Sequence, residues 1–145
     1  MTACTFFGHR DCSWSLYPAV ERAIRRMICA GVADFYVGGQ GTFDAMALRV
    51  LRDVSRDLPW VRYTVVLPYL PSGREPNTES GETVFPEGLE CAPRRFAIER
   101  RNLWMLDRCD GVIAYVNRSY GGAAKFLALA ERQGKTILNL ADEAQ

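Results

Sequence analysis

Short apolar runs alternate along this chain with longer segments in which apolar residues recur at the spacing of a helix. A short apolar run is typical of a buried strand, and recurrence every three to four residues is typical of an amphipathic helix. The expected strands lie at 3–7, 35–37, 61–70, 111–116 and 136–140, and the expected helices at 16–28, 43–56, 94–107 and 121–133. Strands that alternate with helices predict a parallel sheet covered on both faces. We therefore predict an α/β fold of three layers with a mainly parallel sheet of about five strands.

The size of the chain suits one domain. It has 145 residues, of which 48% are hydrophobic and 24% are charged, and these are ordinary values for a globular protein. We therefore expect residues 1–145 to form a single domain. Segment 71–93 interrupts the alternation with four prolines, three glycines and five glutamates. A loop of more than about 15 residues is commonly functional or disordered, so this segment is either a candidate lid over a site or a solvated excursion.

The stretch from Gly38 to Asp44 has the composition of a turn that holds an anion. It follows an apolar run and opens an amphipathic segment, so it joins a strand to the start of a helix. Backbone N–H groups at a helix N-terminus attract phosphate, and glycines let the phosphate come close. The alternatives are a tight turn without a ligand, an N-cap role for Thr42, and an Asp44 that only complements the helix dipole. The residues expected to contact a ligand here are Gly38, Gly39, Gln40, Gly41, Thr42 and Asp44.

Two further turns follow expected strands and point to the same ligand. One is Gly8-His9-Arg10, and the other leads from Asn117 to Tyr120, Gly121 and Gly122. The carboxyl ends of parallel strands meet at one edge of a sheet, so we expect all three turns to line one pocket. Arg10 suits phosphate contact and Tyr120 suits stacking on a base. The structural alternatives are a surface ion pair for Arg10, a hydrogen-bonded strand end for His9, and packing against the sheet for Tyr120.

The sequence indicates no common cofactor or metal site. The turns match neither G-x-G-x-x-G nor G-x-x-x-x-G-K-[ST], so we expect no dinucleotide cofactor and no ATP-hydrolysing P-loop. The five cysteines are odd in number and form no C-x-x-C pair, which argues against a disulfide framework and against zinc. We expect reduced thiols in a cytoplasmic protein, with no metal and no cofactor.

Charge and hydropathy restrict the expected partners. The net charge of +1 argues against nucleic acid as a partner, because non-specific binding to nucleic acid depends on neutralising phosphates. No apolar run approaches the roughly 18 residues that a membrane span needs. We therefore expect a phosphate-bearing small molecule as the ligand and no membrane partner.

The order of these turns resembles the SLOG superfamily of Rossmann-like nucleotide-ligand proteins, which includes the LOG-type phosphoribohydrolases and the DNA-processing protein family. The resemblance spans nearly the whole chain and is greatest for an uncharacterised bacterial branch with a T-F-F-G-H-R start. It implies a Rossmann-like fold, a nucleotide-derived ligand over the carboxyl end of the sheet, and a homodimer. The stretches that carry it are Thr5-Phe6-Phe7-Gly8-His9-Arg10, residues 38–44, Arg95-Phe96-Ala97-Ile98 with Arg101 and Asn102, and Tyr120-Gly121-Gly122-Ala123-Ala124-Lys125. The resemblance also implies that Arg101 and Asn102 contact the ligand.

The chain departs from the LOG enzymes at their catalytic glutamate. These enzymes carry P-G-G-x-G-T-x-x-E, and here Ala45 takes the glutamate position while the acid Asp44 comes one residue earlier. One residue is about 100° of rotation on a helix, so Asp44 need not reach the point where the catalytic glutamate acts. This departure favours the binding or sensing of a nucleotide-derived molecule. The alternative is an N-glycosidase acting on nucleoside 5′-monophosphates, for which Asp44, Glu87 or Glu90 would supply the carboxylate that stabilises an oxocarbenium-like ribose.

Overall fold

A six-stranded parallel sheet forms the centre of the protein in a computed structural model, which describes residues 2–68, 82–84 and 94–143. The strand order is β4-β3-β2-β1-β5-β6, and every neighbouring pair is parallel. The α/β class and the parallel sheet are therefore confirmed, with one strand more than expected. The strands are β1 (Ala3–Gly8), β2 (Asp34–Val37), β3 (Arg62–Val66), β4 (Glu82–Val84), β5 (Gly111–Tyr115) and β6 (Thr136–Asn139).

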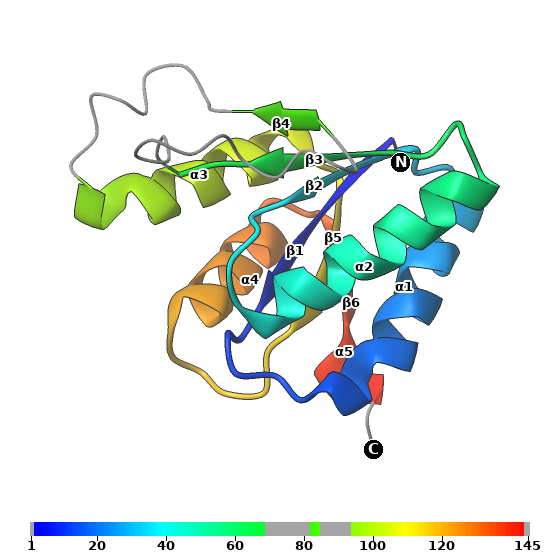
Figure 1. The fold of residues 1–145 in the computed structure, drawn as a ribbon. Coiled ribbons are helices and arrows are strands. Elements are labelled where there is room, and N and C mark those ends of the chain that lie inside the picture. Colours follow the sequence, from blue (N-terminus) through cyan, green and yellow to red (C-terminus); the bar gives the residue numbers. More distant parts are fainter. Residues whose placement is uncertain (1, 69–81, 85–93, 144–145) are drawn as a thin grey trace.

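Helices cover both faces of this sheet and make the three layers (Figure 1). On one face lie α1 (Tyr17–Cys29), α2 (Gly41–Asp57) and the short α5 (Leu140–Glu143). On the other face lie α3 (Arg94–Arg108) and α4 (Gly122–Arg132). Each helix turns its apolar stripe to the sheet, as the periodicity predicts. In α2 the buried residues are Phe43, Met46, Ala47, Val50, Leu51 and Val54.

The additional strand lies in the segment that the sequence analysis treated as one long loop. Residues Glu82–Val84 pair in parallel with β3 and form the outer edge of the sheet. Three residues are too few to show a recognisable period, and this strand is defined by its pairing with Thr64, Val65 and Val66. The expected lid is otherwise outside the described residues, as are Glu87 and Glu90.

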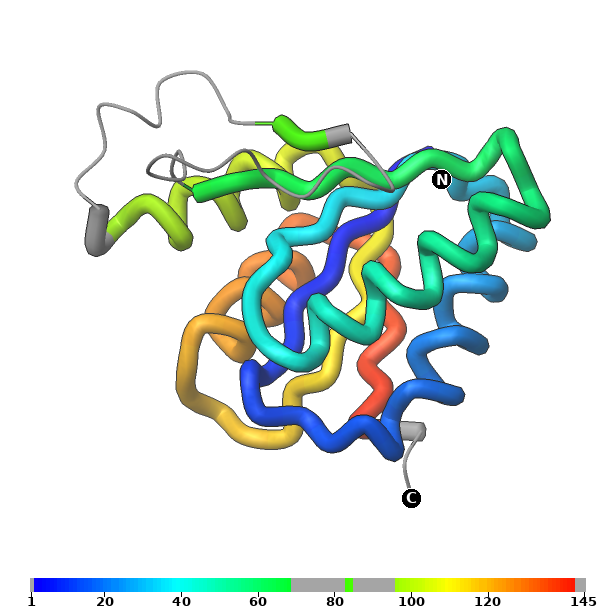
Figure 2. The backbone as a smooth tube through the Cα atoms, viewed as in Figure 1, coloured from blue at the N-terminus to red at the C-terminus, as the bar shows by residue number. Residues whose placement is uncertain are grey.

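The order of the strands creates a switch point between β1 and β5. From β1 the chain builds outward through β2, β3 and β4, and then it returns to the opposite side of β1 with β5 and β6. Figure 2 shows β1 and β5 running side by side through the middle of the fold. In open parallel sheets, ligands bind in the crevice beyond the carboxyl ends of the strands at such a point. The residues after Gly8 and Tyr115 are therefore in the expected position for a site.

The described part of the chain contains no helix that is both long and apolar enough to cross a bilayer.

The cysteines that the structure describes, Cys4, Cys12, Cys29 and Cys109, are free thiols. Burial raises the pKa of Cys12 to about 11 and that of Cys109 to about 12.

Candidate functional site

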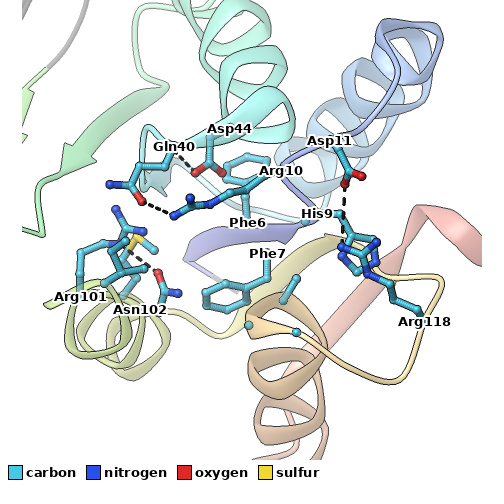
Figure 3. Close-up of a pocket in the computed structure, with 16 residues that line it drawn as sticks. Phe6, Phe7, His9, Arg10, Asp11, Gln40, Asp44, Arg101, Asn102 and Arg118 are labelled. Carbon is cyan, nitrogen blue, oxygen red and sulfur yellow. Dashed lines mark hydrogen bonds and ion pairs between the residues drawn. The ribbon is translucent and has the colours of Figure 1, made fainter. Parts of the chain in front are cut away.

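A pocket of about 540 Å³ opens at the carboxyl ends of β1 and β5 (Figure 3). This volume lies in the usual range of small-molecule sites, which is about 300–1,000 Å³. The pocket takes residues from the β1 end, from the start of α2, from α3 and from the turn before α4. The described lining residues are Phe6, Phe7, Gly8, His9, Arg10, Asp11, Gln40, Asp44, Ile98, Arg101, Asn102, Met105, Arg118, Gly121, Gly122 and Ala123.

Arg101 fastens α3 to the loop after β2. Its side chain is 3% exposed, and its Nη1 donates to the carbonyl oxygens of Gly38 at 2.7 Å and Val66 at 3.3 Å. Its Nε donates to the side-chain oxygen of Asn102 at 2.9 Å. A Cβ on Gly38 would lie 2.7 Å from the guanidinium carbon of Arg101. The absence of a side chain at Gly38 therefore allows Arg101 to come this close. Arg101 also lines the pocket, and its hydrogen bonds to Gly38 and Val66 hold it in place there.

Two backbone donors at the start of α2 are bound within the protein. The N–H of Thr42 donates to the carbonyl oxygen of Arg10 at 2.9 Å. The N–H of Gln40 donates to the Asp44 carboxylate at 3.0 Å. Gly41 has a φ of +84°, and a Cβ there would lie 2.9 Å from the Cα of Arg10. Two donors of this turn are thus already bound within the protein, and an acid already occupies the first turn of the helix.

Asp44 is a partly buried carboxyl group at the edge of the pocket. Burial raises its pKa to about 6, and the Gln40 N–H, Arg101 and Arg10 oppose this rise. Arg10 is itself oriented by a hydrogen bond of 3.2 Å from Nη2 to the side-chain oxygen of Gln40. Figure 3 shows Asp44 beside Gln40 and Arg10 at the edge of the pocket.

The start of α4 differs from that of α2. Within the described residues, no side chain caps the start of α4, and its first turn contains no acid. A Cβ on Gly122 would meet no atom within 4 Å, although Gly122 lines the pocket. Backbone N–H groups at such a helix start carry partial positive charge. This turn therefore offers donors that face the pocket without a side chain in the way.

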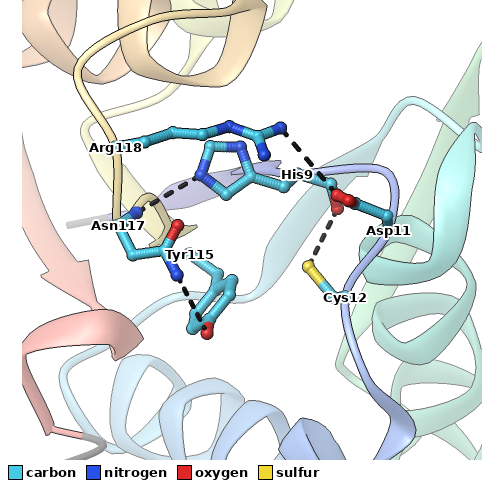
Figure 4. A network of polar contacts seen from close by, with 6 residues as sticks. All are labelled: His9, Asp11, Cys12, Tyr115, Asn117 and Arg118. Carbon is cyan, nitrogen blue, oxygen red and sulfur yellow. Dashed lines mark hydrogen bonds and ion pairs between the residues drawn. The ribbon is translucent and has the colours of Figure 1, made fainter.

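His9 joins the end of β1 to the end of β5 (Figure 4). Its ring is 5% exposed, and its Nε2 accepts a hydrogen bond of 3.3 Å from the Asn117 N–H. Burial and the nearby Arg118 lower the pKa of His9, and Asp11 opposes this. The ring is therefore neutral near pH 7, with its proton on Nδ1. His9 holds the turn before α4 in position over the pocket.

Arg118 extends over the same network. Its Nη2 lies 3.8 Å from a carboxylate oxygen of Asp11, and its guanidinium carbon lies 5.1 Å from the centre of the Tyr120 ring. Both charged groups line the pocket. An exposed pair at this distance contributes little stability, so Arg118 is readily available to an anion in the pocket.

The structure brings together part of the predicted site. Nine predicted residues line the pocket, and the other five are not among its described lining residues. Tyr120 is 69% exposed beside Arg118. After β2, Gly38 lies against Arg101 and Gly41 against Arg10. The lining residues are Gly8, His9, Arg10, Gln40, Asp44, Arg101, Asn102, Gly121 and Gly122, and the others are Gly38, Gly39, Gly41, Thr42 and Tyr120.

Two charged lining residues were not predicted. Asp11 directly follows Arg10, and Arg118 lies within the turn that leads to Gly121. Both lie in turns that the sequence analysis had already assigned to the site, so their position in those turns was the one clue that could have identified them. The second predicted carboxylate, Glu90, lies outside the described residues.

The fold is similar to that of two solved DNA processing proteins A. The structure from Streptococcus pneumoniae has a TM-score of 0.66 and 16% identity, and the match covers 94% of this chain and 49% of that chain. The structure from Helicobacter pylori, described for its single-stranded DNA binding mode, has the same TM-score of 0.66 and identity of 16%, over 94% of this chain and 63% of that chain. This chain thus spans between about half and two thirds of their length. No protein-family model and no curated protein matches the sequence.

At this identity the likeness is one of fold alone. The argument that excluded nucleic acid as a partner is wrong, because a protein with this fold is described as binding single-stranded DNA. Net charge misled because it averages over the chain. Residues 71–93 carry five glutamates and one arginine, so the rest of the chain has 17 lysines and arginines against 12 acids. The chain is a Rossmann-like α/β protein with the fold of the DNA processing proteins.

Proposed function

We propose that the pocket at the switch point binds a nucleotide-derived molecule through its phosphate, as a binding or sensing site. The observation that carries the proposal is the open start of α4, which faces the pocket beside Arg118. The start of α2, although richer in glycine, already uses its donors on Arg10 and Asp44. An anion is stabilised most where backbone donors lack an internal partner. The phosphate therefore belongs at Gly121 and Gly122.

The rest of the pocket suits the remainder of a nucleotide. Arg10 and Arg118 supply positive charge, and Phe6 and Phe7 supply apolar surface beneath it (Figure 3). The carboxylate of Asp44 can accept hydrogen bonds from ribose hydroxyls. This mixture of apolar surface with a few polar groups is typical of small-molecule sites.

A panel of nucleoside mono-, di- and triphosphates, with the matching nucleosides as controls, tests the proposal by thermal shift. A ligand that binds only the folded state raises the melting temperature. We expect a shift for at least one phosphorylated compound and none for its nucleoside. Arg118→Gln should reduce the shift, while Arg22→Gln, an exposed arginine of α1 that does not line the pocket, should preserve it. Equal shifts with and without phosphate would contradict the proposal.

N-glycosidase activity on nucleoside 5′-monophosphates is the second candidate, and Asp44 is the residue that favours it. A carboxyl group whose pKa lies near 6 inside a pocket has the properties of a catalytic acid or base. Release of free base by the wild-type protein, lost in Asp44→Asn while ligand binding remains, would establish turnover. Binding without release of base would support the sensing role.

The nucleotide unit need not be a free molecule. Because the Helicobacter pylori protein is described as binding single-stranded DNA, a short single-stranded oligonucleotide belongs in the same panel. We further propose a homodimer that acts in the cytoplasm, in line with the resemblance and with the free thiols of the described cysteines.

A further inference from the structure

Asn102 is a polar side chain within an otherwise apolar stretch of the pocket wall. Ile98 precedes it by four residues on α3 and Met105 follows it by three, and both also line the pocket. Residues at these spacings lie side by side on one face of a helix. Figure 3 shows Asn102 and Arg118 on opposite sides of Phe7. This part of the wall therefore suits a flat ring that carries one polar group, whereas a phosphate is drawn to the side of Arg118.

The amide group of Asn102 is held in one orientation. Its Oδ1 accepts a hydrogen bond of 2.9 Å from Nε of Arg101, and because an arginine can only donate, the oxygen and nitrogen of the amide cannot exchange places. Arg101 is itself fixed by the bonds from its Nη1 to the carbonyl oxygens of Gly38 and Val66. Within the described residues, no group accepts a hydrogen bond from Nδ2 of Asn102. The free polar group that Asn102 offers to the pocket is therefore a donor.

We propose that Asn102 makes the pocket selective for nucleotides with a keto base, such as hypoxanthine, guanine or uracil. The inference rests on the proposed function, in which a nucleotide binds with its phosphate at Gly121 and Gly122. It adds the class of base that the same site accepts.

The selectivity follows from the end of the amide that Arg101 occupies. An asparagine that recognises adenine uses both ends of its amide, since Oδ1 accepts from the 6-amino group while Nδ2 donates to N7. In this pocket Oδ1 of Asn102 is turned to Arg101, so adenine would bring its amino donor against the donor Nδ2. Guanine presents two acceptors, O6 and N7, at the same edge, and a pyrimidine with a keto group presents O4. A keto base therefore satisfies Nδ2, and an amino base opposes it.

Inosine 5′-monophosphate and adenosine 5′-monophosphate test the inference, because they share the ribose and the phosphate and differ in the base. Isothermal titration calorimetry on the wild-type protein should return an affinity about tenfold higher for the inosine compound, which is the order of effect of a donor left without an acceptor in a partly buried site. Uridine 5′-monophosphate should likewise bind more tightly than cytidine 5′-monophosphate.

Asn102→Asp should reverse this preference. The carboxylate keeps one oxygen for Arg101 and offers the pocket a second oxygen, to which the amino group of adenine can donate. The added charge weakens the binding of both compounds equally, since they carry the same phosphate, so the ratio of their affinities reports the contact with the base. Asn117→Asp is the control, because it adds the same charge in the turn after β5 at a position that does not line the pocket. It should leave the ratio unchanged.

Two results would overturn the inference. One is a wild-type protein that binds adenosine 5′-monophosphate as tightly as inosine 5′-monophosphate, or more tightly. The other is a ratio that Asn102→Asp shifts no more than Asn117→Asp does. In both cases the pocket still binds nucleotides and the proposed function stands. If neither nucleotide binds, the nucleotide site itself is wrong and the selectivity falls with it, so the two failures are distinguishable.

Discussion

At the scale of single residues, the glycines around the site have different physical roles. Gly38 has no side chain because the guanidinium group of Arg101 occupies that space. Gly122 has none although nothing in the described structure occupies the space. The first is explained by packing, and the second is what a ligand site requires. Sequence composition alone treats both as turn glycines.

Gly38→Ala should destabilise the protein by about 1–3 kcal/mol, because a new methyl group would press on a buried, hydrogen-bonded guanidinium. Chemical denaturation measures this loss. Gly122→Ala is the control and should be neutral or slightly stabilising, since it meets no atom within 4 Å and alanine favours the helix. Equal stabilities of the two variants would show that Arg101 adapts without cost.

Asp44 should make stability depend on pH. Its folded pKa, about 6, lies above the ordinary value of 3.8 for an aspartate, so the folded state holds the proton more tightly than the unfolded state. The folded state therefore loses stability as pH rises from about 4 to about 6, and the loss is complete above that range. Asp44→Asn should become progressively more stable than the wild type across this range. Denaturation midpoints at several pH values measure the difference, and Asp53→Asn, at an exposed position of the same helix, should not reproduce it.

At the scale of elements, the two helix starts at the site are not equivalent. The helix α2 carries an acid in its first turn that binds its own backbone, whereas α4 carries none. Giving α4 an internal anion should therefore remove its capacity for an external one.

Gly122→Asp should abolish the nucleotide-induced thermal shift, while the acid stabilises the helix start by about 0.3–1 kcal/mol. Ala128→Asp is the control, because it adds the same charge at an exposed position of α4 that does not line the pocket. An unchanged ligand shift in Gly122→Asp would place the phosphate elsewhere in the pocket.

At the scale of the whole molecule, the outer side of α3 is the candidate dimer interface. Phe96 is 43% exposed and Leu103 is 44% exposed, and both border a hollow with Glu99 and Arg100. Apolar side chains of this size on a helix surface favour burial against a partner, and two-fold symmetric dimers are the commonest assembly.

Light scattering should return about twice the chain mass of 16.3 kDa for the wild type. Leu103→Glu should shift the protein to the monomer, because an isologous contact places the new charge near its symmetry mate. Ala128→Glu is the control, because it adds the same charge at an exposed position of α4, away from α3. A wild-type monomer at all concentrations would contradict the dimer.

The sequence by itself determined the layers of the fold, because strand and helix periods are local properties. The apolar positions of α2 from Phe43 to Val54 predict its buried face correctly, and the three turns were placed at the right strand ends. The edge strand at Glu82–Val84 was missed because only pairing with β3 defines it.

Only the tertiary structure decided which turn is open to a ligand. The turn after β2 looks like an anion site in sequence. Its Thr42 N–H, however, already donates to the carbonyl oxygen of Arg10 in the loop after β1, and its Gln40 N–H donates to Asp44 in the first turn of α2. At the turn before α4, a Cβ on Gly121 or Gly122 would meet no described atom within 4 Å, and no side chain caps the helix. The acid Asp44 is visible in the sequence, but the bond from the Thr42 N–H to the carbonyl oxygen of Arg10 joins residues far apart in the chain, so no local pattern shows that this donor is already bound.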